Sequence, residues 1–110
     1  MKTAKPSIKL QLSRMVKRIV RRYHPERIIL FGSQARGNAT PDSDIDLLVV
    51  MPVSGSKADI ELVIGVALHD FRIPKDIVVS RPEEFAWRKD VVGTIEYPAT
   101  REGKVLYAKS

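Results

Sequence analysis

The chain has 110 residues, of which 44% are hydrophobic, and its formal net charge at pH 7 is +6. This length predicts a single domain over residues 1–110, and the hydrophobic fraction excludes a chain that is disordered throughout. Because the chain contains no cysteine, disulfides and thiolate metal sites are excluded. Any metal ion must therefore be held by oxygen or imidazole ligands.

Hydropathy and charge narrow the class of protein further. The longest apolar runs fall far short of the ~18 residues that a membrane span needs, and the basic N-terminus lacks the apolar segment of a signal peptide. We therefore expect a soluble cytoplasmic protein with no membrane partner. Residues 1–36 hold ten Lys/Arg against one acidic residue, whereas residues 37–110 hold nine against twelve. The basic segment can attract nucleic acid, an acidic partner or a polyphosphate, or it can be an ordinary solvated helix face.

The first predicted element is a helix from Ser7, its N-cap, to about Arg22, with Pro25 ending it. Its apolar residues recur at the spacing of one helical face: Ile8, Leu12, Met15, Val16, Ile19, Val20 and Tyr23. The other face carries six cations: Lys9, Arg14, Lys17, Arg18, Arg21 and Arg22. Cations in the last turns also suit the negative end of the helix dipole.

Two strands are predicted next. Residues 27–31 form a short continuous apolar run that ends at Gly32, which is typical of a buried strand. Residues 38–43 are rich in turn formers, and a tight turn is expected there. Residues 45–51 form a second apolar run, closed by Pro52, which indicates a central strand.

The second half of the chain alternates helices and strands. Ser56 is the predicted N-cap of a helix that ends near Asp70. Residues 73–80 are predicted to form a third strand. Ser80 and Glu83 have the spacing of a capping box, with Pro82 early in the short helix that follows.

The last segments are predicted from their stop signals. Residues 92–102 have a helical pattern that Gly103 ends, and Pro98 within it should kink or split the helix. Residues 105–107 are expected to close the sheet as a short edge strand. This order of elements predicts an α/β or α+β fold, in which a small mixed β-sheet is covered by helices.

The first motif with chemical meaning is Gly32-Ser33, directly after the first predicted strand. Glycine lets the backbone approach a ligand closely, and Ser33 offers a hydroxyl and an N–H donor that suit phosphate oxygens. If residues 33–36 begin a helical turn, its N-terminus favours anions, and Arg36 could supply a guanidinium. A Gly-Ser pair alone is weak evidence, because most such pairs are ordinary strand-to-turn connections.

The second motif is Asp44-Ile45-Asp46, which leads into the central strand. Residues two apart on a strand lie ~6.6 Å apart on one face, so both carboxylates can converge on a cation while Ile45 points into the core. At that distance they repel by about 2 kcal/mol, a cost that bound magnesium would offset. The alternative is an exposed turn at residues 42–44. A calcium-binding EF-hand loop is excluded, because Leu47 and Val53 stand where that loop needs Gly and Glu.

The third motif is Asp76, a carboxylate near the middle of the third predicted strand. If this strand lies beside the central one, Asp76 completes a cluster of three carboxylates and can accept the proton of an attacking hydroxyl. Taken alone, Asp76 is better explained as an exposed acidic residue at a strand start, paired with Lys75 or Arg72. The three motifs together favour the catalytic interpretation.

These residues, Gly32-Ser33, Asp44-x-Asp46 and Asp76, resemble the signature of the minimal nucleotidyltransferases of the DNA polymerase beta superfamily. The stretch GSQARGNATPDSDIDLLVV is similar to that signature, and the closing EGKVLY extends the likeness. The resemblance implies the polymerase beta-like fold, with Gly32 and Ser33 on the nucleotide's phosphates. It also implies two magnesium ions on Asp44 and Asp46, with Asp76 on one metal beside the acceptor. Arg36 matches an arginine common in the signature.

The resemblance further implies an enzyme that transfers a nucleoside monophosphate, AMP from ATP, to a hydroxyl. Minimal nucleotidyltransferases commonly pair with HEPN proteins, often RNase toxins, and modify a tyrosine on them. We therefore expect a hetero-oligomeric antitoxin whose acceptor site lies on its partner. An alternative is a catalytically silent nucleotide- or nucleic-acid-binding module that uses the basic N-terminal helix. The intact aspartate trio argues against it, so a nucleic-acid partner is open but not favoured. A purely structural interaction domain remains only if no nucleotide binds.

Overall fold

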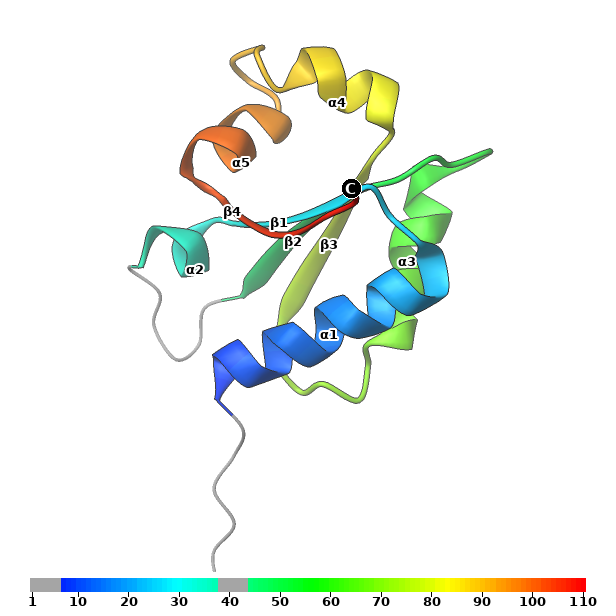
Figure 1. Ribbon diagram of the computed structural model, residues 1–110, viewed down its shortest axis with the longest axis vertical. Helices are drawn as coiled ribbons and strands as arrows, with labels where there is room; N and C mark the ends of the chain where they lie inside the picture. The colour runs from blue at the N-terminus through cyan, green and yellow to red at the C-terminus, as the bar shows by residue number, and fades with distance from the viewer. Residues whose placement is uncertain (1–6, 38–43) are drawn as a thin grey trace, which may run out of the picture.

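A four-stranded mixed sheet forms the centre of the computed structural model, which describes residues 7–37 and 44–110 (Figure 1). The strands, β1 (Arg27–Phe31), β2 (Ile45–Val50), β3 (Lys75–Ser80) and β4 (Lys104–Ala108), lie in the order β3-β2-β1-β4. β1 is antiparallel to β2 and β4, whereas β2 and β3 are parallel. The expected mixed sheet is confirmed, and the turn expected at residues 38–43 lies outside the described residues.

Helices cover both faces of the sheet. In Figure 1, α1 (Ile8–Tyr23) and α3 (Lys57–Ala67) lie on one face, and α4 (Pro82–Arg88) and α5 (Glu96–Glu102) lie on the other. The short α2 (Ser33–Arg36) follows the end of β1. None of the helices in the described part of the chain is long and apolar enough to cross a membrane.

The central strand β2 is buried on both sides, which explains its continuous apolar run. Its alternate residues Leu47 and Val49 pack in the core under α1 and α3, whereas Leu48 and Val50 pack with residues of α4 and α5. The fully buried side chains of the larger core include Met15, Ile19, Ile28, Ile45 and Ile64. Aliphatic side chains thus fill most of the larger core.

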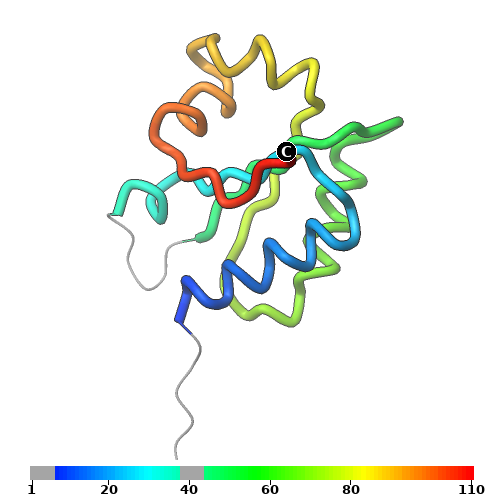
Figure 2. The backbone as a smooth tube through the Cα atoms, viewed as in Figure 1, coloured from blue at the N-terminus to red at the C-terminus, as the bar shows by residue number. Residues whose placement is uncertain are grey.

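α1 begins and ends within one residue of its predicted bounds. Ser7 caps its N-terminus, because the Ser7 hydroxyl accepts a hydrogen bond from the Leu10 amide at 3.1 Å. His24 caps the other end in the left-handed conformation, and its amide donates to the Val20 carbonyl. Figure 2 traces α1 as it passes the end of α3, where Arg18 forms an ion pair with Asp70.

Two local predictions in the second half are wrong. The helix that starts after Ser56 ends at Ala67 rather than near Asp70, whose side chain binds Arg18 instead. The predicted capping box does not form: Arg81 is the N-cap of α4, although Pro82 occupies the first turn as expected. Ser80 is the last residue of β3, and its buried hydroxyl donates to Glu96 at 2.8 Å.

The segment around Pro98 also differs from its prediction. α5 begins only at Glu96, so Pro98 lies in the first turn, where an amide N–H needs no partner, and the helix is neither kinked nor split. Glu96 is 4% exposed and accepts hydrogen bonds from the Ser80 hydroxyl and from Arg88. This buried carboxylate joins β3, α4 and α5, while the Thr94 hydroxyl accepts a hydrogen bond from the Tyr97 amide at the start of the helix.

Gly103, between α5 and β4, is required by close packing. A Cβ there would overlap the Ala99 carbonyl and lie 2.8 Å from the Leu30 carbonyl, and neither backbone oxygen can move aside. We expect Gly103→Ala to lower the free energy of unfolding by about 3 kcal/mol or more. In the matched control Gly65→Ala, on α3, a Cβ meets nothing within 4 Å, and we expect a gain of up to about 1 kcal/mol. Urea unfolding of both variants measures the difference, and equal stabilities would contradict the packing argument.

Candidate active site

The predicted site residues gather at one end of the sheet. Strand β1 ends at Phe31, which pairs with Asp46 near the start of β2, and Asp46 in turn pairs with Asp76 of β3. Asp44 immediately precedes β2. Because side chains alternate along a strand, Asp46 points to the same face as Leu48 and therefore lies on the α4 and α5 side of the sheet. The register thus places the three carboxylates and Gly32 close together.

Gly32 and the Asp46 carboxylate are in direct apposition. Gly32 has φ 76° and ψ −158°, a conformation that is essentially restricted to glycine. A Cβ at this position would overlap Oδ2 of Asp46. The backbone at the end of β1 is therefore packed against a carboxylate, with no room for any side chain between them.

The first turn of α2 leaves donors beside this contact. The amides of Ala35 and Arg36 both donate to the Gly32 carbonyl at 3.1 Å, so the hydrogen bonds of the turn begin there. The first N–H groups of a helix have no partner within the helix. Among the described residues, neither the amide nor the hydroxyl of Ser33 forms a hydrogen bond. Both groups can therefore donate to an anion held next to Asp46.

The electrostatics of Asp46 reflect its position between two other carboxylates. Partial burial raises the pKa of Asp46, the negative charges of Asp76 and Asp44 raise it further, and Arg36 opposes them. The ionised form is thus disfavoured in the free protein. A cation that binds beside Asp46 would remove this penalty, which is an electrostatic reason for the site to bind metal.

The carboxylates suit magnesium that is also bound by a nucleotide. Among residues 7–37 and 44–110, no three acidic or histidine side chains are arranged to hold a metal ion by themselves. Asp44 and Asp76 are exposed. Magnesium in proteins usually keeps only one or two carboxylates and takes its other ligands from phosphates and water. The donors present fit that pattern, with nucleotide phosphates completing the coordination.

Glu102 is a site neighbour that the sequence analysis did not identify. Its carboxylate lies 3.5 Å from the Arg36 guanidinium, and both side chains are about half exposed. The pair joins α2 to the end of α5 and holds Arg36 near Asp46. The only sequence signal was the family likeness of the closing EGKVLY segment, since nothing local links Glu102 to Arg36.

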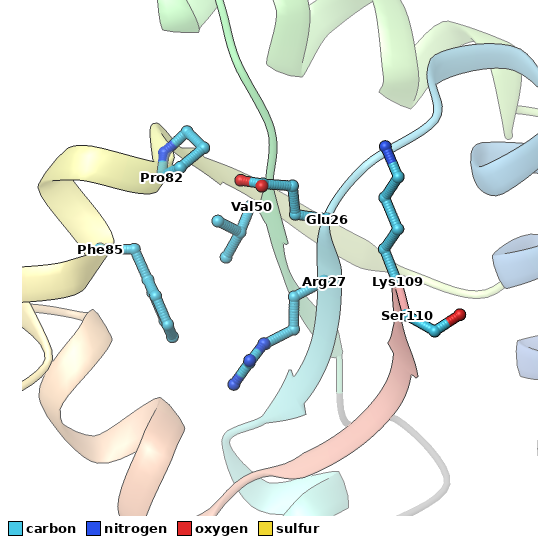
Figure 3. A pocket seen from close by; sticks show the side chains of 7 residues that line it. All are labelled: Glu26, Arg27, Val50, Pro82, Phe85, Lys109 and Ser110. Carbon is cyan, nitrogen blue, oxygen red and sulfur yellow. The ribbon is translucent and has the colours of Figure 1, made fainter.

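A hollow of about 410 Å³ at the opposite end of the sheet does not share these properties (Figure 3). Phe85 and Arg27 face one another across it, with the guanidinium 5.7 Å from the ring centre. Arg27 pairs with Val50, at the far ends of β1 and β2 from Phe31. Among the described residues that line it, Glu26 alone has a carboxylate side chain. The hollow therefore lacks the paired acids that a metal-dependent site needs.

Comparison with known proteins identifies the family. The model of the family described as nucleotidyltransferase domain matches residues 12–100, a range that contains all the predicted site residues. The chain belongs to the nucleotidyltransferase domain family. The expectation of a nucleotidyltransferase enzyme is therefore confirmed. The protein MJ0604 of Methanocaldococcus jannaschii, named as a protein adenylyltransferase, is 35% identical over 85 residues, which cover 74% of this chain and 78% of the relative.

Solved structures share the fold of this nucleotidyltransferase domain. A nucleotidyltransferase from Sulfolobus solfataricus has a TM-score of 0.62 at 20% identity, over 99% of this chain and 93% of that one. A chain from a toxin-antitoxin crystal structure with AMP-PNP has a TM-score of 0.57 at 19% identity, over 89% of this chain and 74% of that one. These identities are low, so the likeness concerns the fold.

Proposed function

We propose that this nucleotidyltransferase transfers AMP from ATP to a hydroxyl of a partner protein, a tyrosine of a HEPN-type toxin, and so acts as its antitoxin. The observation that carries the proposal is the apposition of the Gly32 backbone to the Asp46 carboxylate, with Asp76 in register beside it. Groups that can donate hydrogen bonds to phosphate oxygens thereby lie next to carboxylate oxygens that can bind a metal ion. A metal-nucleotide complex presents both kinds of group together, so it matches this arrangement.

In this proposal, the residues around Gly32 bind the triphosphate. The Ser33 amide and hydroxyl donate to phosphate oxygens, and the exposed backbone of Gly32 lets the phosphates approach closely. Arg36, held by Glu102, supplies positive charge to the same group. Asp44 and Asp46 would hold two magnesium ions, and Asp76 would be a further ligand of one of them. Bound magnesium offsets the charge of the triphosphate and of the leaving pyrophosphate.

In the same proposal, Asp76 also serves as the proton acceptor. The acceptor oxygen bonds to the α-phosphorus of ATP, the bond from that phosphorus to the pyrophosphate oxygen breaks, and the hydroxyl proton passes to Asp76. Asp76 is exposed on the edge strand β3, so a partner can reach it.

The choice of a protein acceptor rests on the relatives and on the surface. The relative MJ0604 is named as a protein adenylyltransferase. A further fold neighbour comes from a structure described as a tri-AMPylated Shewanella oneidensis HEPN toxin in complex with MNT antitoxin. The matched chain has a TM-score of 0.50 at 18% identity, over 92% of this chain and 72% of that one. Large apolar side chains are also exposed here: Leu62, Val63 and Val66 on α3, and Trp87, Val91, Val92 and Ile95 near α4 and α5. Such exposed apolar residues favour a hetero-oligomer.

The test is transfer of label from ATP radiolabelled at the α-phosphate, with magnesium, to the proteins of a native cell lysate, followed by identification of the labelled protein. We expect the partner's tyrosine to be labelled and its RNase activity to fall. Asp76→Asn should slow transfer by about 100-fold or more while ATP still binds, because it removes the proton acceptor. Asp59→Asn, an exposed carboxylate on α3, is the control and should transfer normally. Label on a small molecule or RNA, with the partner unlabelled, would overturn the proposed acceptor.

A further inference from the structure

The outer face of α1 carries a concentration of positive charge that the transferase site does not use. The helix has six Lys/Arg and no acidic residue. Arg18 has a structural role, since it pairs with Asp70, donates to the Ala67 carbonyl at 2.9 Å and stacks on Phe71 at 4.7 Å. Arg18 thereby fastens α1 to α3.

The other five cations have no such role. Their side chains are exposed, and within residues 7–37 and 44–110 none of them forms an ion pair: Lys9, Arg14, Lys17, Arg21 and Arg22. They extend along about 20 Å of helix. Four of them, with Arg18, line a shallow hollow of about 370 Å³. We call these five residues the α1 basic face.

The composition of the α1 basic face discriminates between anionic partners. An interfacial membrane helix needs Trp, Phe or Leu beside its cations, and Leu10 is the one large apolar residue exposed on α1. The centre of a protein interface is apolar and depleted of charged residues taken together. Interfaces with nucleic acid are polar and strongly positive. Stacking of single-stranded bases requires aromatic side chains, and Tyr23, the one aromatic residue of α1, packs against the core.

We propose that the α1 basic face binds the phosphodiester backbone of a nucleic-acid duplex, without reading its sequence. The face lies on the α1 and α3 side of the sheet, whereas Asp46 points to the α4 and α5 side, so the surface is separate from the nucleotide site. The proposal does not depend on the transferase function. Contacts limited to phosphates predict similar affinity for RNA and DNA duplexes and a steep dependence on salt.

The experiment is fluorescence anisotropy with labelled 20-base-pair RNA and DNA duplexes between 25 and 200 mM KCl. For three to five phosphate contacts, log K should fall against log[KCl] with a slope of about −3 to −4.5. The Arg14→Gln, Lys17→Gln, Arg21→Gln triple variant should reduce the magnitude of this slope by about 3 and weaken binding at least about tenfold at low salt. Glutamine keeps the helix propensity, and circular dichroism checks the fold.

A control variant that loses the same number of positive charges outside α1 distinguishes binding by the α1 basic face from attraction by the net charge of the protein. Arg72→Gln, Lys104→Gln, Lys109→Gln removes three exposed cations that lie off α1, and we expect it to bind duplexes within about twofold of the wild type, as residues without a phosphate contact should. Equal losses in both triple variants would overturn the proposal. Tighter binding of a single strand than of a duplex, or equally effective competition by poly-glutamate, would also overturn it.

Discussion

Gly32→Ala is expected to abolish nucleotide transfer while the protein remains folded. A Cβ at residue 32 would overlap Oδ2 of Asp46, which is the free end of a side chain and can swing away. The clash is therefore relieved by displacing a proposed magnesium ligand rather than by unfolding the sheet. We expect transfer to fall at least about 100-fold, since displacing a group by 1 Å in an active site has an effect of this size.

The positive φ of residue 32 adds backbone strain, so stability should fall by about 1 to 3 kcal/mol. The control is Gly55→Ala, which also has a positive φ, 98°, but where a Cβ meets nothing within 4 Å. This variant bears the strain without the clash, so it should lose stability and keep its activity. Thermal unfolding, calorimetric titration with Mg-ATP and initial transfer rates separate the two effects. A Gly32→Ala protein that transfers AMP at the wild-type rate would refute the apposition as the basis of the site.

Asp46→Asn is expected to raise the stability of the free protein while it destroys activity. Burial first, and then Asp76 and Asp44, raise the pKa of Asp46. The folded state therefore binds this proton more tightly than the unfolded chain does. The stability contributed by Asp46 is fully present below the ordinary aspartate pKa of 3.8 and is lost as pH rises through the higher folded pKa. At pH 7, the ionised carboxylate destabilises the free fold.

Neutral asparagine removes this penalty, and we expect a gain of about 1 kcal/mol at pH 7 after allowance for solvent screening. The gain should vanish below pH 3.8. Saturating Mg-ATP should reverse the order, because a ligand present at 100 times its Kd stabilises the wild type by about 2.7 kcal/mol. Asp59→Asn, in the exposed first turn of α3, should instead lose a few tenths of a kcal/mol. Thermal unfolding from pH 3 to 8, with and without Mg-ATP, tests this, and a wild type more stable than Asp46→Asn without ligand would contradict it.

The expected effects of Gly32→Ala and of Asp46→Asn could be foreseen from the sequence to different extents. The Gly32-Ser33 and Asp44-x-Asp46 motifs were visible in the sequence, because each is short and follows or begins an apolar strand. The penalty on Asp46 was foreseen only as repulsion from Asp44 along one strand. The contribution of Asp76 depends on the parallel pairing of β2 and β3, which joins residues thirty positions apart.

The order of the main helices and strands and the family of this protein could be predicted from the sequence. Helix periodicity and the Ser7 cap depend on residues within about four positions of one another, and such interactions form with little tertiary help. The resemblance of the Gly32-Ser33 and Asp44-x-Asp46 motifs to a known signature then indicated a nucleotidyltransferase, which the family match confirmed.

The partners of the long-range polar contacts could not be predicted from local sequence. Ser80 donates a hydrogen bond to the distant Glu96 instead of capping α4. Glu102 forms an ion pair with Arg36, and Asp70 forms one with Arg18, one of the six cations on α1. A hydroxyl or guanidinium group can form hydrogen bonds with many different partners, and the neighbouring sequence does not show which partner it will bind. The register of the sheet and the packing of its helices select among them, because burial makes an unpaired polar group costly. The same packing leaves the α1 basic face exposed.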